Sequence, residues 1–213
     1  GMIQAYAYTD ERGFYVEASQ VVESDGSYTI DGDPVNRELG KMGKSLKNAV
    51  APDEMCERYG ADTLRLYEMF SGPLDQSRPW DTTAVVGMYR LLQRVWRLFV
   101  DETTGSIRVD SAAAPSDDTT RVLHRTIDSV RDGMETMRFN TSIARITELT
   151  NHLTSTYPDG GVPSTVAETL ALLLAPIAPH IAEELWSRLD HPGSLAYEPF
   201  PVADPQWLVD DSV

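Results

Sequence analysis

From residue 82 onward, apolar side chains return at every third or fourth position, and this helical period constrains the fold more than any other feature. The first run predicts an amphipathic helix over 82–102, with an apolar face formed by Val85, Met88, Leu92, Val95 and Phe99. Later runs with the same period cover residues 123–137, 143–153 and 166–185. Amphipathic helices joined by short loops predict an antiparallel bundle, because each apolar stripe is buried against its neighbours.

Several residues predict the ends of these helices. Asp117 and Asp118 can cap the helix whose apolar face runs to Met137. Pro176 and Pro179 interrupt the backbone hydrogen-bond ladder, so we expect a break or a kink near them. The proline-rich stretch 191–213 predicts an irregular tail over the surface.

The first 51 residues have a different character. Short β-forming runs at 3–8, 13–16 and 27–30 are separated by polar turns. The dipeptide Asp25-Gly26 between β-forming residues predicts a hairpin, and the polar residues 31–34 predict a second turn. The sequence therefore predicts a small β-rich segment ahead of the bundle, in a chain that is mainly α.

Two short helices are expected between these parts. Pro52 at the first helical position starts one, and Gly60 is placed to supply its left-handed cap. The second helix covers 61–70. Three acids lie in or near the first turn of the first helix, at Asp53, Glu54 and Glu57. They could indicate a metal site, but stabilisation of the helix dipole explains them better.

Composition restricts the function classes. The 213 residues suffice for one large domain or two small ones, and the formal charge of −15 argues against nucleic acid as a partner. Locally, however, residues 37–47 and 88–97 are basic. The single cysteine, Cys56, excludes an internal disulfide and a Cys-based zinc site. No apolar run reaches the roughly 20 residues of a membrane span, and no signal peptide is visible, so we expect a cytoplasmic location without a membrane partner.

The segment that carries chemistry is Lys41-Met42-Gly43-Lys44-Ser45. It lies between a turn and a helix start, which predicts a loop. Two lysines three residues apart, followed by a hydroxyl, can surround a polyphosphate and stabilise negative charge that grows in a transition state. Gly43 would let the backbone approach closely. A solvated basic loop without a ligand is the alternative interpretation of these five residues.

A longer pattern includes this segment. Residues 41–80 read KMGKSLKNAVAPDEMCERYGADTLRLYEMFSGPLDQSRPW, and the blocks GMYRLLQRVWRLF, RFNTSIARITEL and LLLAPIAPHIAEELW follow at 87–99, 138–149 and 172–186. In this order they resemble the part of class I aminoacyl-tRNA synthetases that begins at the second ATP motif, KMSKS. The resemblance is strongest to the leucyl enzymes. The valyl and isoleucyl enzymes share the block at 59–62 and stay as alternatives.

The resemblance implies roles for individual residues. Lys41 and Lys44 would be catalytic and would bind ATP through its phosphates, with Lys44 the main ligand, and Ser45 would match the last motif residue. Gly43 stands where the motif has serine, and Lys47 stands where glycine is often found. The implied reaction is ligation of leucine to tRNA(Leu), with ATP and Mg²⁺ as cofactors.

The resemblance also implies an anticodon-binding-type helical domain that contacts the tRNA body. Arg90, Arg94 and Arg97 share one helix face and could contact phosphates, or could pair with acids of a neighbouring helix. We expect Trp96 and Trp186 to lie in the core. His180, beside Pro179, is better explained as a helix-start residue than as a ligand.

The implied domains are 1–51, β-rich with the KMSKS-type loop; 52–78, a short-helix stem-contact region; 79–190, the helical bundle; and 191–213, the tail. No HIGH-type motif is present, since the four histidines are isolated. We therefore expect this piece alone not to aminoacylate, and we expect a monomer. The alternative from another class is a non-catalytic helical module that binds a protein partner, which the acidic composition favours slightly.

Overall fold

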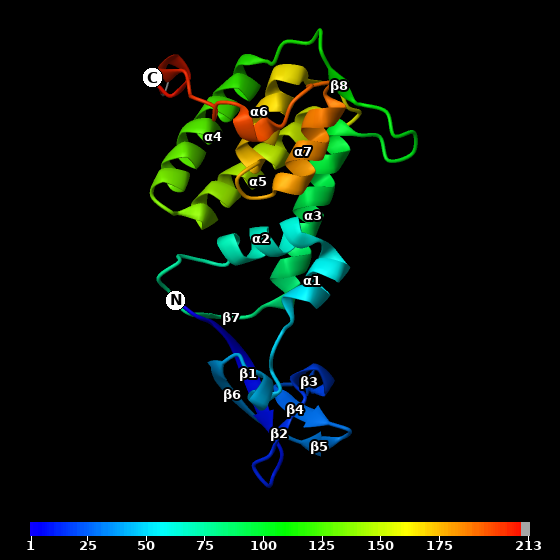
Figure 1. Cartoon of the computed structure of the whole chain (residues 1–213), viewed down its shortest axis with the longest axis vertical. Helices are drawn as coiled ribbons and strands as arrows, with labels where there is room; N and C mark the ends of the chain where they lie inside the picture. Colours follow the sequence, from blue (N-terminus) through cyan, green and yellow to red (C-terminus); the bar gives the residue numbers. More distant parts are fainter. Residues whose placement is uncertain (210–213) are drawn as a thin grey trace. The chain divides into compact units, whose positions relative to one another are not determined.

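The computed structural model describes residues 1–209, and the chain divides into two compact units (Figure 1). The strand unit comprises Gly1–Arg58 and Leu74–Thr82, and the helical unit comprises Tyr59–Pro73 and Thr83–Val213. Positions 210–213 of the predicted tail lie outside the described residues. Helices predominate, as the sequence predicts for a mainly α chain with a small β-rich start.

The strand unit is organised around β1 (Ile3–Thr9). Antiparallel partners flank it, β2 (Tyr15–Val16) on one side and β6 (Asn36–Lys41) on the other, and β7 (Arg78–Pro79) pairs with it in parallel. β6 was not predicted, and Lys41, expected in a loop, is its last residue. The sequence of β6 has few β-formers; pairing along β1, from Gln4↔Lys41 to Thr9↔Asn36, overrides that weak preference.

A second sheet joins β3 (Val22–Ser24), β4 (Ser27–Ile30) and β5 (Asp33–Pro34) by two tight hairpins. Asp25 and Gly26 connect Ser24 to its partner Ser27 with φ of 49° and 78°. Positive φ at both central residues is the type I′ geometry, for which Asp-Gly is suited because glycine pays no steric cost there. The predicted hairpin at 25–26 and the turn at 31–34 are thus confirmed.

The two short helices also form where expected, α1 at Pro52–Tyr59 and α2 at Ala61–Phe70. Asp53 and Glu54 lie in the first turn of α1, where negative charge stabilises the helix dipole. Gly60 has φ 86° and ψ 151°, so its φ is positive but its ψ is extended, and the left-handed cap predicted there is wrong in detail.

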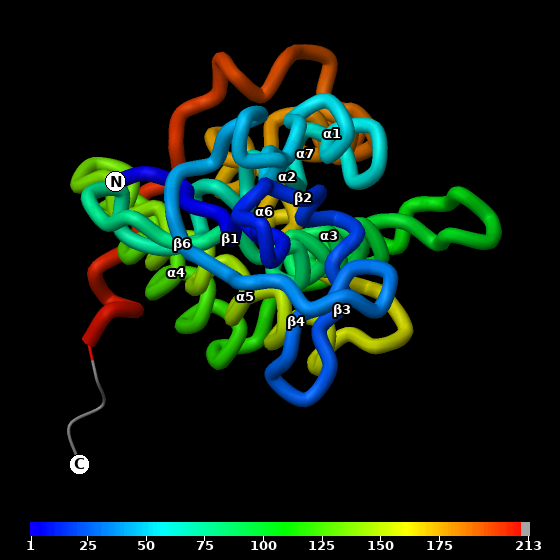
Figure 2. Tube along the Cα trace, turned by 90° about the horizontal axis from the view of Figure 1, so that it is seen from below, coloured from blue at the N-terminus to red at the C-terminus, as the bar shows by residue number. Residues whose placement is uncertain are grey.

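The helical unit contains α2 and five further helices, which are α3 (Thr82–Phe99), α4 (Asp117–Glu135), α5 (Phe139–Thr156), α6 (Ser164–Leu174) and α7 (Pro179–Arg188). α4 and α5 pack side by side, and α2 packs on α5 and α7 (Figure 2). The centre of the core is fully buried at α5 and α6; its residues there include Ile143, Ile146, Leu149, Leu153, Leu170, Leu173 and Leu174. The predicted helical period therefore marks the core correctly.

Helix ends show where local chemistry overrides the period. α3 ends at Phe99 rather than 102, because the Asp101 carboxylate accepts the N–H groups of Thr103 and Thr104 at 2.9 Å and forms a turn instead. These backbone hydrogen bonds, with Thr104 the larger cause, lower the pKa of Asp101.

The boundaries of α4 differ in two ways from the prediction. Its N-cap is Ser116, whose Oγ accepts the Thr119 N–H at 3.2 Å, while Asp117 and Asp118 occupy the first turn. Met137 lies beyond the helix with φ 57° and is 65% exposed, so it does not extend the apolar face. The Arg138 N–H donates to Gly133 O at 2.7 Å, which closes a Schellman-type end around Met137.

The expected break in the last helical run is confirmed, because α6 ends at Leu174 and α7 begins at Pro179. The parallel pair of β8 (Val109–Asp110) and β9 (Val162–Pro163) joins the two long loops. Between α7 and residue 209 the chain is irregular apart from the 3-10 helices η3 (Leu195–Tyr197) and η4 (Pro205–Trp207). None of the helices within residues 1–209 is long and apolar enough to cross a membrane.

Candidate functional site

The lysine motif lies at the end of β6 in the strand unit. Lys41 closes the strand, Met42 and Gly43 continue without regular structure, and Lys44–Leu46 form the 3-10 helix η2. The side chains of Lys41, Lys44 and Ser45 are exposed. Within residues 1–209, neither Lys41 nor Lys44 has an ion pair. Two unneutralised ammonium groups on a short turn can attract a polyphosphate.

The two departures from the KMSKS pattern have different backbone settings. Gly43 is extended, with φ −172° and ψ 146°, and a Cβ there would have no neighbour within 4 Å. Serine would therefore fit at this position, and the turn does not depend on glycine. Lys47 adopts the left-handed conformation, φ 51° and ψ 31°, which glycine occupies with the least strain.

The base of the loop is held by contacts that the sequence did not predict. Asn48 is only 4% exposed, and its Oδ1 accepts the Gly43 N–H at 2.9 Å. The Val50 N–H lies 3.4 Å from the Met42 sulfur, and the Ala18 N–H donates to Lys47 O at 2.9 Å. Lys47 Nζ is 3.9 Å from a Glu17 carboxylate oxygen. The base is thus fixed by the Asn48 side chain and by backbone contacts, while the side chains of Lys41 and Lys44 face solvent.

The predicted basic face lies on α3. Arg90 and Arg97 are exposed, Arg94 is half-buried, and Arg94 Nε is buried without a hydrogen-bond acceptor among the described residues. Arg97 pairs with Glu102 at 3.0 Å. Glu102 follows α3 in the chain, so this acid does not come from a neighbouring helix.

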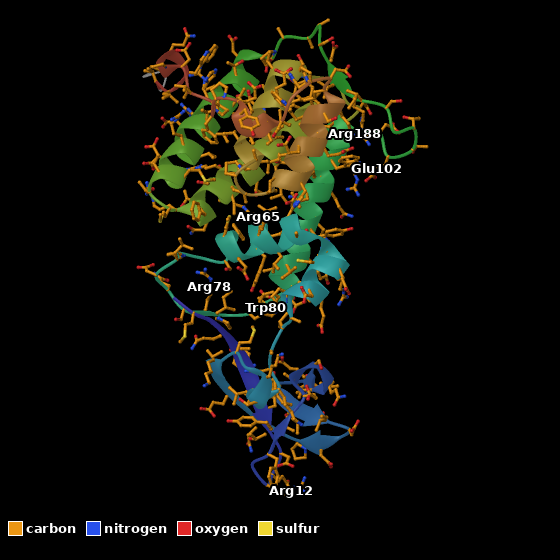
Figure 3. The ribbon with its side chains drawn as sticks, in the orientation of Figure 1. Arg12, Arg65, Arg78, Trp80, Glu102 and Arg188 are labelled. Atoms are coloured by element: carbon orange, nitrogen blue, oxygen red, sulfur yellow. The ribbon has the colours of Figure 1, made fainter. Side chains whose placement is uncertain are left out.

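Trp96 and Trp186 were both expected in the core. Trp186 is 5% exposed and confirms this. Trp96 is only half-buried, and the Arg188 guanidinium lies 5.0 Å from its ring centroid. Arg188 and Glu102 both lie near the C-terminal part of α3 (Figure 3). The core prediction for Trp96 is therefore wrong, because an arginine covers the ring in place of an apolar neighbour.

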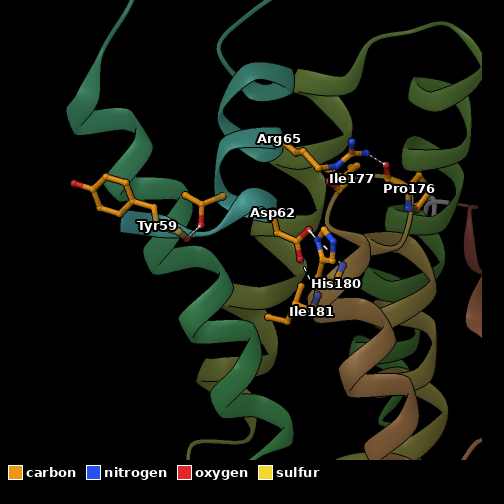
Figure 4. Close-up of polar contacts among 8 residues, drawn as sticks. Tyr59, Asp62, Arg65, Pro176, Ile177, His180 and Ile181 are labelled. Carbon is orange, nitrogen blue, oxygen red and sulfur yellow. Dashed lines mark hydrogen bonds and ion pairs between the residues drawn. The ribbon is translucent and has the colours of Figure 1, made fainter. Parts of the chain in front are cut away.

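Two oppositely charged side chains of α2, Asp62 and Arg65, bind the chain where it is interrupted between α6 and α7 (Figure 4). Asp62, 7% exposed, accepts the Ile181 N–H at 2.7 Å and the His180 N–H at 3.3 Å, and one of its oxygens is 2.8 Å from His180 Nδ1. Asp62 therefore caps the start of α7 from another helix. His180 is the second residue of α7, which confirms its prediction as a helix-start residue.

Arg65 lies three residues after Asp62 on α2 and binds the residues between α6 and α7. Its Nε donates to Ile177 O and its Nη2 to Pro176 O, both at 2.9 Å. In a continuous helix the His180 and Ile181 amides would bond these carbonyls, but both amides donate to Asp62 instead. The guanidinium donates to both carbonyls at once. Sequence reasoning missed Asp62 and Arg65; their spacing of three on a short helix was the available signal.

Comparison with known proteins identifies relatives along the whole chain. The family described as "Anticodon-binding domain of tRNA ligase" matches residues 119–213. The leucine–tRNA ligase of Streptomyces avermitilis is 62% identical over 213 residues, which are 100% of this chain and 22% of that protein. The leucine–tRNA ligase of Rhodococcus jostii is 60% identical over 213 residues, with the same coverage of 100% and 22%. The chain thus spans about a fifth of the length of these relatives.

Solved structures agree with this. A LeuRS of Agrobacterium radiobacter K84, in a ternary complex with tRNA and LeuAMS, superposes with a TM-score of 0.67 and 28% identity, over 79% of this chain and 23% of that one. A Mycobacterium tuberculosis methionyl-tRNA synthetase bound by methionyl-adenylate shares the fold, with a TM-score of 0.50 and 11% identity over 85% and 70% of the two chains. Taken with the sequence relatives, this shows that the whole chain is similar to a segment of about 22% of these leucine–tRNA ligases.

Proposed function

We propose that this chain is the part of a leucine–tRNA ligase that supplies the ATP-phosphate loop and contacts with the tRNA body. The observation that carries the proposal is the match of the whole chain, at 62% identity, to a leucine–tRNA ligase. The full-length protein would charge tRNA(Leu) with leucine at the expense of ATP. The chain alone would not aminoacylate, because it covers only 22% of such an enzyme.

The proposed reaction has two steps. A carboxylate oxygen of leucine bonds to the α-phosphorus of ATP, and the bond to the bridging oxygen breaks, so that pyrophosphate leaves. A hydroxyl of the terminal adenosine of the tRNA then attacks the acyl carbon, loses its proton, and AMP leaves. Lys41 and Lys44 would stabilise the negative charge that develops on the departing pyrophosphate. The exposure of both ammonium groups and their lack of ion pairs within residues 1–209 support this role.

Mg²⁺ would accompany the ATP phosphates. Among residues 1–209, no group of three or more His, Cys, Asp or Glu side chains could hold a metal ion. Within this part of the chain, Mg²⁺ would therefore be held mainly by the ATP phosphates. Ser45, next to Lys44, would offer a hydroxyl to a phosphate oxygen.

For the tRNA we propose contacts from Arg90, Arg94 and Arg97. Arg90 is exposed. Arg94 is half-buried with its Nε out of reach of solvent, so it would contact a phosphate through its other guanidinium nitrogens, whereas Arg97 would have to exchange Glu102 for a phosphate. A phosphate contact by arginine releases counterions, so such contacts would weaken as salt rises.

The protein would act in the cytoplasm as a monomer.

Lys44→Ala in the full-length protein tests the ATP role. Leucine-dependent pyrophosphate exchange should fall at least about 100-fold, as for removal of one charge-stabilising donor, while tRNA affinity stays within about twofold. Lys47→Gln removes a cation from the same loop without changing its backbone preference and should have a much smaller effect. Unchanged exchange in Lys44→Ala would refute the ATP role.

Replacing Arg90, Arg94 and Arg97 together by alanine tests the basic face. The slope of log affinity for tRNA against log salt should become shallower by up to about 0.7–0.9 for each lost phosphate contact. Arg145→Ala removes an exposed arginine on α5 that pairs with Glu148 at 2.7 Å, and serves as the control. An unchanged affinity and slope in the triple variant would eliminate this face as a tRNA contact.

A further inference from the structure

The strand unit contains one buried polar side chain among its described residues, and it lies directly behind the lysine motif. Asn48 is 4% exposed. Its carboxamide makes three hydrogen bonds to backbone: Oδ1 accepts the Gly43 N–H at 2.9 Å, and Nδ2 donates to Lys41 O at 3.2 Å and to Ala5 O at 3.3 Å. One acceptor and both donors of the amide are thus used.

These three contacts join the motif to the sheet. Ala5 belongs to the central strand β1 and is itself buried, so it is a rigid reference point. Lys41 and Gly43 are the residues on either side of Met42, and Lys44 comes next. Fixing the carbonyl of Lys41 and the amide of Gly43 to one side chain therefore sets the direction in which the chain leaves β6. That direction determines where the Lys44 side chain starts.

We infer that Asn48 is a positioning residue, whose carboxamide holds the backbone from Lys41 to Lys44 so that both ammonium groups are directed at a nucleoside triphosphate before it binds. The inference rests on the ATP role proposed above. Charges that are already oriented stabilise a transition state without the cost of reorganising it, whereas a loop ordered only on binding loses part of its binding energy. The amide acts through Lys41 and Lys44 and does not touch the nucleotide.

Hydrogen exchange in the full-length protein provides the first test. Asn48→Ala removes the acceptor of the Gly43 N–H, so exchange of that amide should accelerate about tenfold or more, while the amides of β1 keep their protection. Asn36→Ala changes an exposed asparagine at the start of β6, the strand that ends at Lys41, and should leave Gly43 protected. Asn48→Asp retains the acceptor oxygen and should restore part of the protection. An unchanged Gly43 exchange rate in Asn48→Ala would overturn the inference.

Pyrophosphate exchange, corrected for the folded fraction, provides the second test. Loss of the two contacts to the motif backbone should lower kcat about four- to 100-fold, at about two- to tenfold for each net hydrogen bond. On a Lys44→Ala background the same change should cost less than about threefold, because the main ammonium group to be positioned is gone. A purely structural role for Asn48 predicts the same loss of kcat with and without Lys44→Ala, and that result would refute the positioning role.

The two proposals fail in different ways. If Lys44→Ala leaves pyrophosphate exchange unchanged, the ATP role fails and the inference about Asn48 falls with it. If Lys44→Ala is strongly impaired but the effect of Asn48→Ala is equal on both backgrounds, the ATP role stands and only the positioning role is refuted. Partial recovery of kcat in Asn48→Asp supports the role of the Gly43 contact, and no recovery despite restored Gly43 protection contradicts it.

Discussion

Gly133→Ala tests the close approach of α4 and α5. A Cβ at Gly133 would lie 2.1 Å from Ser142 Oγ, 3.2 Å from Arg138 O and 3.4 Å from Ser142 Cβ. Ser142 is fully buried and its hydroxyl donates to Val130 O at 3.4 Å, so rotating the side chain away from the new methyl group breaks that contact. The backbone carbonyl of Arg138 and the Cβ of Ser142 would still be crowded.

The expected magnitude combines three effects. Overpacking costs about 1–3 kcal/mol, and the lost hydrogen bond costs about 1 kcal/mol. Alanine gains about 1 kcal/mol over glycine in helix propensity. The free energy of unfolding should therefore fall by about 1–3 kcal/mol, which lowers Tm by about 2–4 °C for each kcal/mol in a chain of this size. Thermal and urea unfolding followed by circular dichroism would measure it.

Gly87 in α3 offers the matched control. A Cβ there would meet nothing within 4 Å, so Gly87→Ala should raise the free energy of unfolding by about 0.5–1 kcal/mol. The double variant Gly133→Ala, Ser142→Ala removes the clashing oxygen and should be more stable than the sum of the single changes predicts. If Gly133→Ala is as stable as the parent, or gains as much as Gly87→Ala, the close packing of α4 on α5 is wrong.

Other variants test other parts of the chain. Asp62→Ala should lower the free energy of unfolding by about 2–4 kcal/mol in urea titrations, since the α7 amides lose a buried charged cap; stability equal to the parent would refute the capping. Lys47→Gly should raise it by about 0.5–1 kcal/mol, because glycine relieves the left-handed backbone, and a loss would contradict this. Gly43→Ser should change stability by less than about 0.5 kcal/mol, and a larger loss would show that the extended backbone is not as described. The Asp101 turn should be stabilised at pH values above the unfolded-state pKa of this carboxyl, and this stabilisation should be lost as pH falls through the lower folded-state pKa. The NMR chemical shift of the Thr104 amide would report the loss. If that shift follows an ordinary aspartate titration, the prediction is wrong.

Much of the fold follows from local sequence. The period of three to four predicted α3 to α7, and Asp25-Gly26 predicted its hairpin, because these signals depend on residues that are near in sequence. The break at Pro176–Pro179 followed from two missing amide donors. The helical period does not set the helix ends: α3 ends before the predicted residue 102 because the Asp101 carboxylate accepts nearby backbone N–H groups.

The parts that could not be predicted depend on distant partners. β6 exists because β1 offers it a ladder, and the Asn48 amide reaches a carbonyl 43 residues away. Asp62 and Arg65 gain their role only when α2 packs beside residues more than 100 positions later. For the candidate site, the motif predicted Lys41 and Lys44, but nothing in the neighbouring sequence predicted that Asn48 would hold their backbone.

The opposite charges of Asp62 and Arg65 have a consequence for how the helical unit assembles. A carboxylate meets amides and, one turn further on, a guanidinium meets carbonyls. If α2 slid by one turn along its neighbours, the acid would move toward carbonyl oxygens or the base toward N–H groups, and both would be repelled. Apolar contacts alone would tolerate such a slide more readily. The two opposite charges therefore fix the register of α2 along its neighbours.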